Sequence, residues 1–201
     1  NGGRGGHATA ALIRHDLAPF LIGQEATEVE ALNDAMLDHM HYVGRGGIVS
    51  FAVSAVDIAL WDLRCAHAGK PLWQMAGGAS KTCNAYGGGI DLAYPLPKLL
   101  DHVQSYLDAG LSAVKIKVGQ PDLSEDIARI RAVRQQIGPE AGFAIDANYS
   151  LTVEEAILLA NAVKTEAILW FEEPILPDLY AGYAEITRAT GMPVAQGENL
   201  H

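Results

Sequence analysis

The sequence predicts an α/β fold: a (β/α) barrel of the TIM type, of which the first five strands are present, preceded by a helical N-terminal region. Two observations carry this prediction. From residue 81 onward, short apolar segments alternate with amphipathic ones, which is typical of a parallel sheet covered by helices. Each apolar segment after the first ends in charged or amide residues, as barrel strands do when they build a site at their carboxyl ends.

The N-terminal region has a helical pattern throughout. Helices are expected over about residues 8–21, 27–42 and 48–69. Thr27, with Glu30 three residues later, has the spacing of a capping box, so we expect the second helix to begin there. A Gly-Lys-Pro sequence ends the third helix.

The pattern changes after Gly77-Gly78, which predicts a helical domain over residues 1–78 and a catalytic domain over residues 79–201. The second region shows five strand segments and four helical segments in strict alternation. The strands are expected at residues 82–88, 112–119, 142–148, 167–174 and 193–199, and the helices at residues 95–110, 123–138, 152–165 and 178–191.

A doubly wound sheet is the alternative architecture for such alternation. It would more often carry a glycine-rich phosphate loop after its first strand, and the glycines at 87–89 do not follow that pattern. A complete barrel has eight strands in about 250 residues. Five strands therefore predict that the sequence is a fragment, or part of a longer protein.

The composition excludes several kinds of partner. The chain has 14 basic and 24 acidic residues, a formal charge of −10, and no basic cluster, so neither nucleic acid nor an anionic membrane is expected as a partner. Cys65 and Cys83 match no zinc or CxxC spacing and are expected to be reduced thiols of a cytoplasmic protein. No apolar run reaches the roughly 18 residues that span a bilayer.

Three carboxylates close successive strands. Asp146, Glu172 and Glu198 are each 26 residues apart, one βα unit, so they are expected at the same level on neighbouring strands. Converging carboxylates repel one another unless a cation neutralises them, and an all-oxygen set of ligands suits Mg²⁺ better than zinc. We predict that these three residues bind Mg²⁺, although solvated strand-end acids are the simpler alternative.

Lys115 and Lys117 lie two residues apart in the apolar segment SAVKIKVG. Side chains two apart on a strand share one face, so both amines are expected in the cavity beside the carboxylates. A neighbouring ammonium and partial desolvation lower a lysine pKa toward neutrality, which suits a proton-abstracting base. We therefore predict Lys117 as the base and Lys115 as the neighbour that lowers its pKa. The alternative is that both stems extend to solvent.

Together these groups predict a reaction class. A divalent cation that holds a substrate carboxylate acidifies its α proton, because it stabilises the enediolate that remains after a lysine removes that proton. A Schiff-base aldolase that uses either lysine is an alternative, but its mechanism has no role for three aligned carboxylates.

Four motifs and one helical segment then resemble the mandelate racemase subgroup of the enolase superfamily, in the mandelate racemase/muconate lactonizing enzyme family. The motifs are K-x-K at 115–117, D-x-N at 146–148, W-F-E-E-P at 170–174 and G-E-N at 197–199. The segment at residues 52–78 is similar to the end of that family's capping domain, which implies that residues 1–78 are the helical part of such a domain.

The resemblance implies roles for individual residues. Lys117 would be the acid/base, and Asp146, Glu172 and Glu198 would bind Mg²⁺. Three further side chains would lie at the substrate: Asn148, Glu173 and Asn199. The family's second acid/base, a His paired with an Asp on later strands, would lie beyond residue 201, and family analogy also suggests a homo-oligomer.

Two reactions share the predicted intermediate. Dehydration of an acid sugar, an aldonate or aldarate, is the leading hypothesis, and racemisation or epimerisation of a 2-hydroxy acid or related carboxylate is the alternative. A barrel that only binds a metal and an acid, without catalysis, is a hypothesis of a different class.

Overall fold

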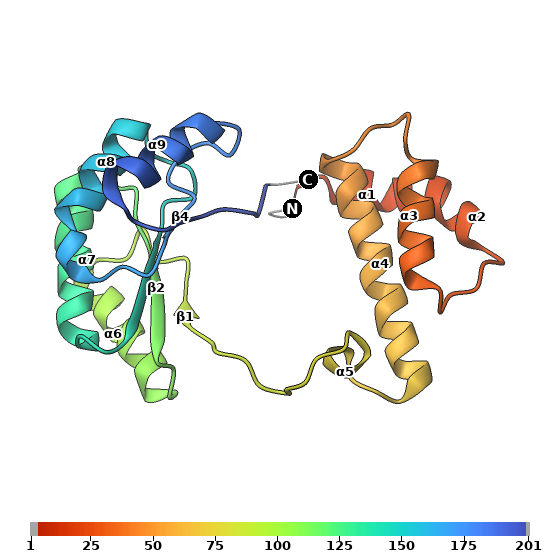
Figure 1. The fold of residues 1–201 in the computed structure, drawn as a ribbon, viewed down its shortest axis with the longest axis horizontal. Helices are drawn as coiled ribbons and strands as arrows, with labels where there is room; N and C mark the ends of the chain where they lie inside the picture. Colours follow the sequence, from red (N-terminus) through yellow and green to blue (C-terminus); the bar gives the residue numbers. More distant parts are fainter. Residues whose placement is uncertain (1–3, 200–201) are drawn as a thin grey trace. The chain divides into compact units, whose positions relative to one another are not determined.

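The computed structural model describes residues 4–199, which form two compact units, residues 4–83 and residues 84–199. The first unit is helical and the second contains a sheet covered by helices (Figure 1). The roles predicted for these regions, a capping domain and a catalytic domain, stay predictions. No helix among the described residues is both long and apolar enough to cross a membrane.

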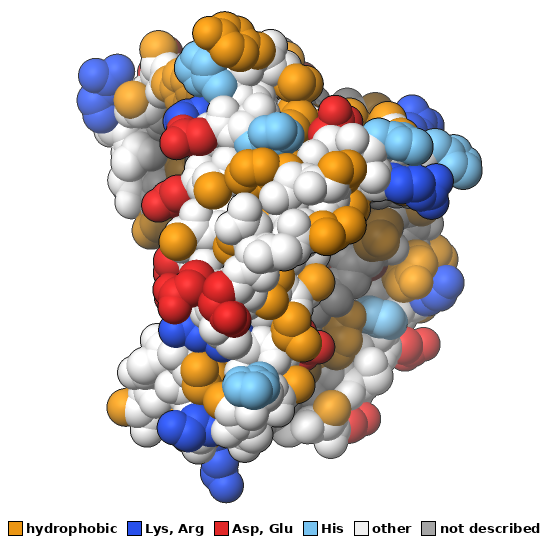
Figure 2. All heavy atoms as spheres, turned by 90° about the vertical axis from the view of Figure 1, so that its right-hand side faces the viewer, with side chains coloured by type: hydrophobic (Ala, Val, Ile, Leu, Met, Phe, Trp, Pro, Cys, Tyr) orange, Lys and Arg blue, Asp and Glu red, His pale blue; other side chains and the backbone are white. Residues whose placement is uncertain are grey.

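The helical unit is built from short and long helices in chain order. They are α1 (Gly6–Leu12), a π-helical turn η1 (Ile13–Leu17), α2 (Ala18–Leu21), α3 (Val29–His39), α4 (Gly47–Ala68) and α5 (Leu72–Met75). Leu17, Met36 and Ala52 are fully buried in a core where α1 and α3 pack against α4. Many other hydrophobic side chains of this unit are exposed among polar ones (Figure 2).

The capping box predicted at Thr27 is wrong. The N-cap of α3 is Glu28, and no side chain caps that helix end. The helix therefore begins later than predicted, at Val29, and the Thr27 hydroxyl donates a hydrogen bond to Glu25 Oε1 at 2.7 Å. The third helix agrees with its prediction, since α4 ends at Gly69 in the left-handed conformation, with φ at 62°.

The second unit contains a parallel sheet of five strands. They are β1 (Gly87–Gly88), β2 (Ala113–Lys117), β3 (Gly142–Asp146), β4 (Phe171–Glu172) and β5 (Val194–Ala195), all parallel and ordered β1-β2-β3-β4-β5. The strands are shorter than predicted. Four helices connect them: α6 (Leu96–Asp108), α7 (Leu123–Ile137), α8 (Val153–Ala162) with the 3-10 turn η2 (Lys164–Glu166), and α9 (Tyr180–Thr190).

The strand order distinguishes the two candidate architectures. Each strand pairs with the next one in the chain, as in a barrel, whereas a doubly wound sheet reverses its order at a switch point. The barrel-type α/β prediction is confirmed by this sheet and by the structural relatives described below.

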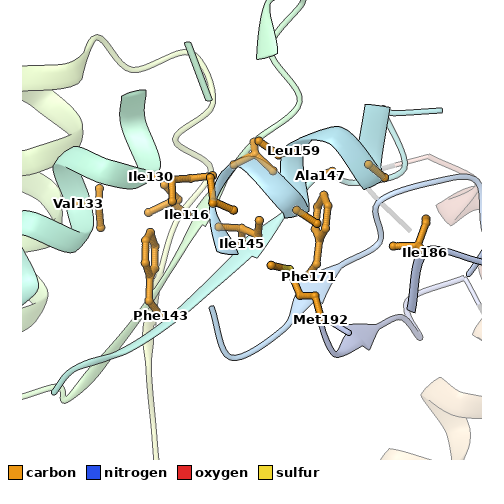
Figure 3. Packing of buried hydrophobic residues seen from close by; sticks show 14 of the residues in the cluster. Ile116, Ile130, Val133, Phe143, Ile145, Ala147, Leu159, Phe171, Ile186 and Met192 are labelled. Carbon is orange, nitrogen blue, oxygen red and sulfur yellow. The ribbon is translucent and has the colours of Figure 1, made fainter. Parts of the chain in front are cut away.

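The alternation predicted for β2 is also confirmed. Val114, Ile116 and Val118 are each 1% exposed and belong to the core cluster beneath the helices. Figure 3 shows Ile116 in this cluster with Ile145 of β3 and Phe171 of β4. The intervening lysines therefore point to the other face of the sheet.

Candidate active site

Four charged side chains converge at the carboxyl ends of three adjacent strands. Lys115 and Lys117 come from β2, Asp146 from β3 and Glu172 from β4. In the ladder Lys117 is opposite Asp146, and Asp146 is opposite Glu172. This register brings together four of the residues predicted from the sequence.

These groups form a continuous chain of ion pairs. Lys117 Nζ lies 2.6 Å from Asp146 Oδ2, and Lys115 Nζ lies 3.4 Å from the same oxygen and 2.5 Å from Glu172 Oε1. The Asp146 side chain is only 2% exposed, so its charge is compensated by ammonium groups rather than by water. Two carboxylate oxygens from neighbouring strands thus converge on one cation, here the Lys115 ammonium.

The pairing also controls protonation. Burial would raise the pKa of Asp146, but hydrogen bonds from Lys117 and from the Asn148 N–H hold it below its ordinary value. Burial would lower the pKa of Lys115, but its hydrogen bond to Glu172 and the Asp146 charge raise it above its ordinary value. Both groups are therefore held in their charged forms. The effect predicted for the Lys115 ammonium on Lys117 stays a prediction.

An open cavity of about 490 Å³ lies beside the two lysines. It is lined by Tyr86, Gly88, Gly89, Ile90, Lys115 and Lys117. The Tyr86 ring contacts the Trp170 ring edge to face, with centroids 5.4 Å apart, and the Lys115 ammonium lies 5.4 Å from the Tyr86 centroid. A small polar molecule in this cavity would meet both amines and one aromatic wall.

Sequence reasoning gave Tyr86 and Trp170 no role. Trp170 Nε1 donates a hydrogen bond to Glu172 Oε2 at 2.9 Å, which fixes the carboxylate oxygen that Lys115 does not bind. Trp170 belongs to the W-F-E-E-P motif, so its position two residues before the acid was the available signal. Tyr86 directly precedes three glycines, and no periodicity distinguishes it.

The backbone after β3 and β4 is strained. Asn148, Tyr149 and Glu173 have φ values of 42°, 56° and 40°, a left-handed region that residues with a Cβ rarely occupy. The Tyr149 N–H donates to the Glu173 carbonyl at 2.5 Å, which ties the two strand ends together. Such strain gathers at functional sites. The turn places the Asn148 N–H 2.9 Å from Asp146 Oδ1, so Asn148 lies beside the predicted ligand.

Glu173 follows the end of β4, and its side chain contacts the segment after β5. It is 2% exposed and its Oε1 accepts the Gly197 N–H at 3.4 Å, while its Oε2 has no partner among the described residues. Burial, followed by the charge of Glu198, raises the pKa of Glu173. Glu198 is therefore a neighbour of Glu173. Glu198 and Asn199 are exposed.

The three predicted metal ligands stay predictions, although two of them, Asp146 and Glu172, lie at neighbouring strand ends. Within residues 4–199, no group of three His, Cys, Asp or Glu side chains is arranged to hold a metal ion. The oxygens of Asp146 and Glu172 already converge on a cation, and carboxylate oxygens are the donors that Mg²⁺ prefers. The donor pair fits Mg²⁺, and the roles of Glu198, Glu173, Asn148 and Asn199 stay predictions.

Comparison with known proteins identifies the family. Residues 1–77 match the mandelate racemase/muconate lactonizing enzyme N-terminal domain, and residues 98–201 match the enolase C-terminal domain-like family. The chain belongs to the mandelate racemase/muconate lactonizing enzyme family of the enolase superfamily. The predicted family is thereby confirmed.

Relatives of known activity are sugar-acid enzymes. A 3,6-anhydro-α-L-galactonate cycloisomerase of Streptomyces coelicolor is 43% identical over 197 residues, which cover 98% of this chain and 55% of the relative. An L-talarate/galactarate dehydratase of Salmonella typhimurium is 34% identical, covering 99% of this chain and 49% of the relative. The chain spans about half the length of these curated relatives.

Solved structures of the family have the same fold. A racemase from Streptomyces coelicolor with bound magnesium has a TM-score of 0.95 and 42% identity, covering all of this chain and 60% of its own. An L-talarate dehydratase from Polaromonas sp. JS666, complexed with Mg and L-glucarate, has a TM-score of 0.90 and 31% identity, covering 98% of this chain and 55% of its own.

Proposed function

We propose that the protein removes the proton α to the carboxylate of an acid sugar and then eliminates the β-hydroxyl as water, with Mg²⁺ as cofactor. The observation that carries this proposal is the convergence of two lysines and two carboxylates at neighbouring strand ends. The dehydratases and the magnesium complexes among its relatives support it.

The cofactor would be held by Asp146 and Glu172, with Glu198 as the third predicted ligand. When bound, Mg²⁺ would withdraw charge from the substrate carboxylate and so acidify the α proton. Lys117 is the group proposed to accept that proton at Nζ, which faces the cavity beside Asp146. Lys115 would keep the Glu172 and Asp146 carboxylates from repelling each other and would add positive charge where the substrate anion binds.

Substrate contacts are proposed for Asn148, Glu173 and Asn199. Asn148 has the strongest structural support, because it lies beside Asp146. Tyr86 and Trp170 would exclude water from one side of the cavity and so strengthen the interaction of the amines with an anionic substrate.

Isomerisation is the second candidate, and the cycloisomerase relative favours it. In a 3,6-anhydro acid sugar the leaving group on the β carbon is an ether oxygen instead of a hydroxyl. Loss of the same α proton would then open the ring without release of water. A racemase or epimerase would return the proton to the α carbon. All three reactions begin with the step assigned to Lys117.

One experiment separates these reactions. The complete natural chain that contains these residues is incubated in D₂O with Mg²⁺ and a set of aldonates, aldarates and anhydro acid sugars. A 2-keto-3-deoxy product that has lost one water supports dehydration, and a keto product of unchanged formula supports cycloisomerisation. Deuterium at the α carbon without a keto product supports racemisation. If no substrate gives a keto product or exchanges its α proton, the proposed function is wrong.

We also propose that the protein is a cytoplasmic homo-oligomer. The small number of cysteines, both free in the described structure, supports a cytoplasmic protein, and the family suggests a homo-oligomer that acts on a small carboxylate. Light scattering of the complete chain tests the oligomeric state, and a monomer would contradict it.

A further inference from the structure

The backbone N–H of Lys117 has no strand partner on the β1 side. The ladder between β1 and β2 pairs Gly87 with Val114 and Gly88 with Lys115, and it stops there. Lys117 is two residues further along β2. Its N–H would therefore be left without an acceptor at the edge of the cavity, and an unsatisfied N–H at such a place is costly.

A side chain takes the place of the missing strand. Asp91, in the loop between β1 and α6, accepts the Lys117 N–H at Oδ1 over 2.9 Å. Asp91 is only 1% exposed, so its carboxylate is solvated by protein groups rather than by water. A buried carboxylate that receives a backbone N–H is a strong, directional contact, and it fixes the level of Lys117 relative to β1.

Arg129 of α7 holds Asp91 in this position. Its Nη2 donates to the Asp91 carbonyl at 3.0 Å and lies 3.7 Å from Asp91 Oδ1, and its Nη1 donates to the Tyr94 carbonyl at 2.7 Å. Arg129 is 6% exposed. The guanidinium thus fastens both ends of the Asp91 loop and compensates its buried charge.

A second carboxylate fixes the chain just after Lys117. Asp126, also on α7 and fully buried, accepts the N–H groups of Gly119 and Gln120 at 2.8 and 2.9 Å. Gln120 Nε2 in turn donates to the Leu92 carbonyl at 2.6 Å. The backbone at Lys117 and just after it is therefore tied to α7 and to the Asp91 loop.

We propose that Asp91 is a positioning residue for Lys117: its carboxylate completes the sheet where β1 ends, and so holds the Lys117 amine at the height where it reaches both Asp146 and the cavity. This inference rests on the proposed function, in which Lys117 accepts the α proton. Asp91 itself does not contact Asp146 or Glu172, and it acts through the backbone of Lys117.

The test compares Asp91→Ala with Asp91→Asn in the complete natural chain. Alanine removes the acceptor, whereas the asparagine carbonyl oxygen can still receive the Lys117 N–H. We expect D91A to lower kcat for α-proton exchange on the order of 10²-fold, the effect of a displacement near 1 Å in a catalytic group, with KM little changed. D91N is expected to restore most of kcat. Asp101→Ala, at an exposed position on α6, is the matched control.

A second measurement is independent of activity. Hydrogen exchange at the Lys117 amide should be faster in D91A than in the wild type and close to wild type in D91N. Because D91A leaves the Arg129 charge buried without its partner, it can fail to fold. The double variant Asp91→Leu with Arg129→Met then removes the acceptor together with its own ion-pair partner, and it is expected to show the same fall in kcat.

The outcomes separate the positioning role from the proposed function. An unchanged kcat in D91A, or equal losses in D91A and D91N, would overturn the proposal. If the wild type exchanges no α proton at all, the proposed function fails, and amide exchange alone then decides: an unprotected Lys117 amide in the wild type, or unchanged protection in D91A, would refute the contact.

Discussion

Asp146 Oδ2 lies 2.6 Å from Lys117 Nζ on the neighbouring strand, and the two residues are directly opposite in the ladder. The same oxygen lies 3.4 Å from Lys115 Nζ. One buried carboxylate therefore accounts for two ammonium groups on an otherwise apolar strand, because it offsets their repulsion. The sheet register alone produces this arrangement, since β2 and β3 bring residues 117 and 146 to the same level.

The first prediction concerns the proposed base. Lys117→Ala should lower kcat for α-proton exchange by about 10² to 10⁴-fold, the range that a positioned general base contributes. Isotope exchange in D₂O, followed by mass spectrometry of the substrate, measures it. The control is Lys164→Ala, which removes an exposed lysine from η2. An active K117A protein would assign the base to another residue.

The second prediction concerns the cation. Mg²⁺ should raise the melting temperature of the complete natural chain, because a ligand that binds only the folded state stabilises it by about 2.7 kcal/mol at a concentration 100 times its Kd. Asp146→Asn and Glu172→Gln should each remove most of this Mg²⁺-dependent shift.

Glu140→Gln is the control for this experiment, because Glu140 is exposed in a loop outside the site. Glu198→Gln tests the ligand that the described structure does not place beside the other two. A loss of the shift would support its predicted role, and an unchanged shift would exclude it. No shift in the wild type at millimolar Mg²⁺ would contradict the metal site.

Local patterns in the sequence predicted the sheet and the convergence of Lys115, Lys117, Asp146 and Glu172 at neighbouring strand ends. The alternation of apolar residues in β2 predicted which face the two lysines share, and the spacing of Asp146 and Glu172 predicted their register. Both are consequences of the repeating βα unit, which the sequence displays directly. The 26-residue spacing also holds for Glu198, but Glu198 follows β5 in an exposed segment, whereas Asp146 and Glu172 end their strands.

Contacts between residues far apart in the sequence could not be predicted from such patterns. Asp91 and Arg129 are 38 residues apart and contact each other, and Asp91 accepts the Lys117 N–H where β1 stops pairing. No periodicity predicts where a strand stops pairing. The capping box shows the same limit at short range. Thr27 has the correct spacing, but α3 begins at Val29 and its N-cap is Glu28. The described structure has a capping box at Thr152 and Glu155 instead, and the sequence analysis did not identify it.

The third prediction uses that capping box, which begins α8. The Thr152 hydroxyl accepts the Glu155 N–H at 3.2 Å, and Glu155 Oε2 accepts the Thr152 N–H at 2.8 Å. Thr152→Ala should lower the free energy of unfolding by about 1 kcal/mol, measured by urea denaturation. Glu154→Gln, in the same helical turn but outside the box, is the control. Combining T152A with Glu155→Ala should add little, because each change already breaks the pair; full additivity would contradict the reciprocal bond.

The last prediction follows from a buried tyrosine on α9. Tyr183 is 8% exposed and its hydroxyl donates to the Ile175 carbonyl at 2.6 Å. Burial, followed by the charge of Glu173, raises the pKa of Tyr183 to about 12 from an ordinary value of 10.0. Between these two pH values the unfolded chain loses this proton while the folded chain keeps it. Rising pH therefore favours unfolding through this group, with a slope of up to about 1.4 kcal/mol per pH unit.

The stabilising contribution of Tyr183 is complete below pH 10.0 and is lost as pH rises toward about 12. Tyr183→Phe should therefore cost about 1 to 3 kcal/mol near neutral pH, where it leaves a buried carbonyl without its donor, and the cost should shrink above pH 10 because phenylalanine cannot ionise. Urea denaturation of both proteins across this range measures the difference. Tyr180→Phe, at an exposed position on the same helix, should show no such trend, and a Y183F cost that stays constant up to pH 12 would show that the Tyr183 pKa is not raised.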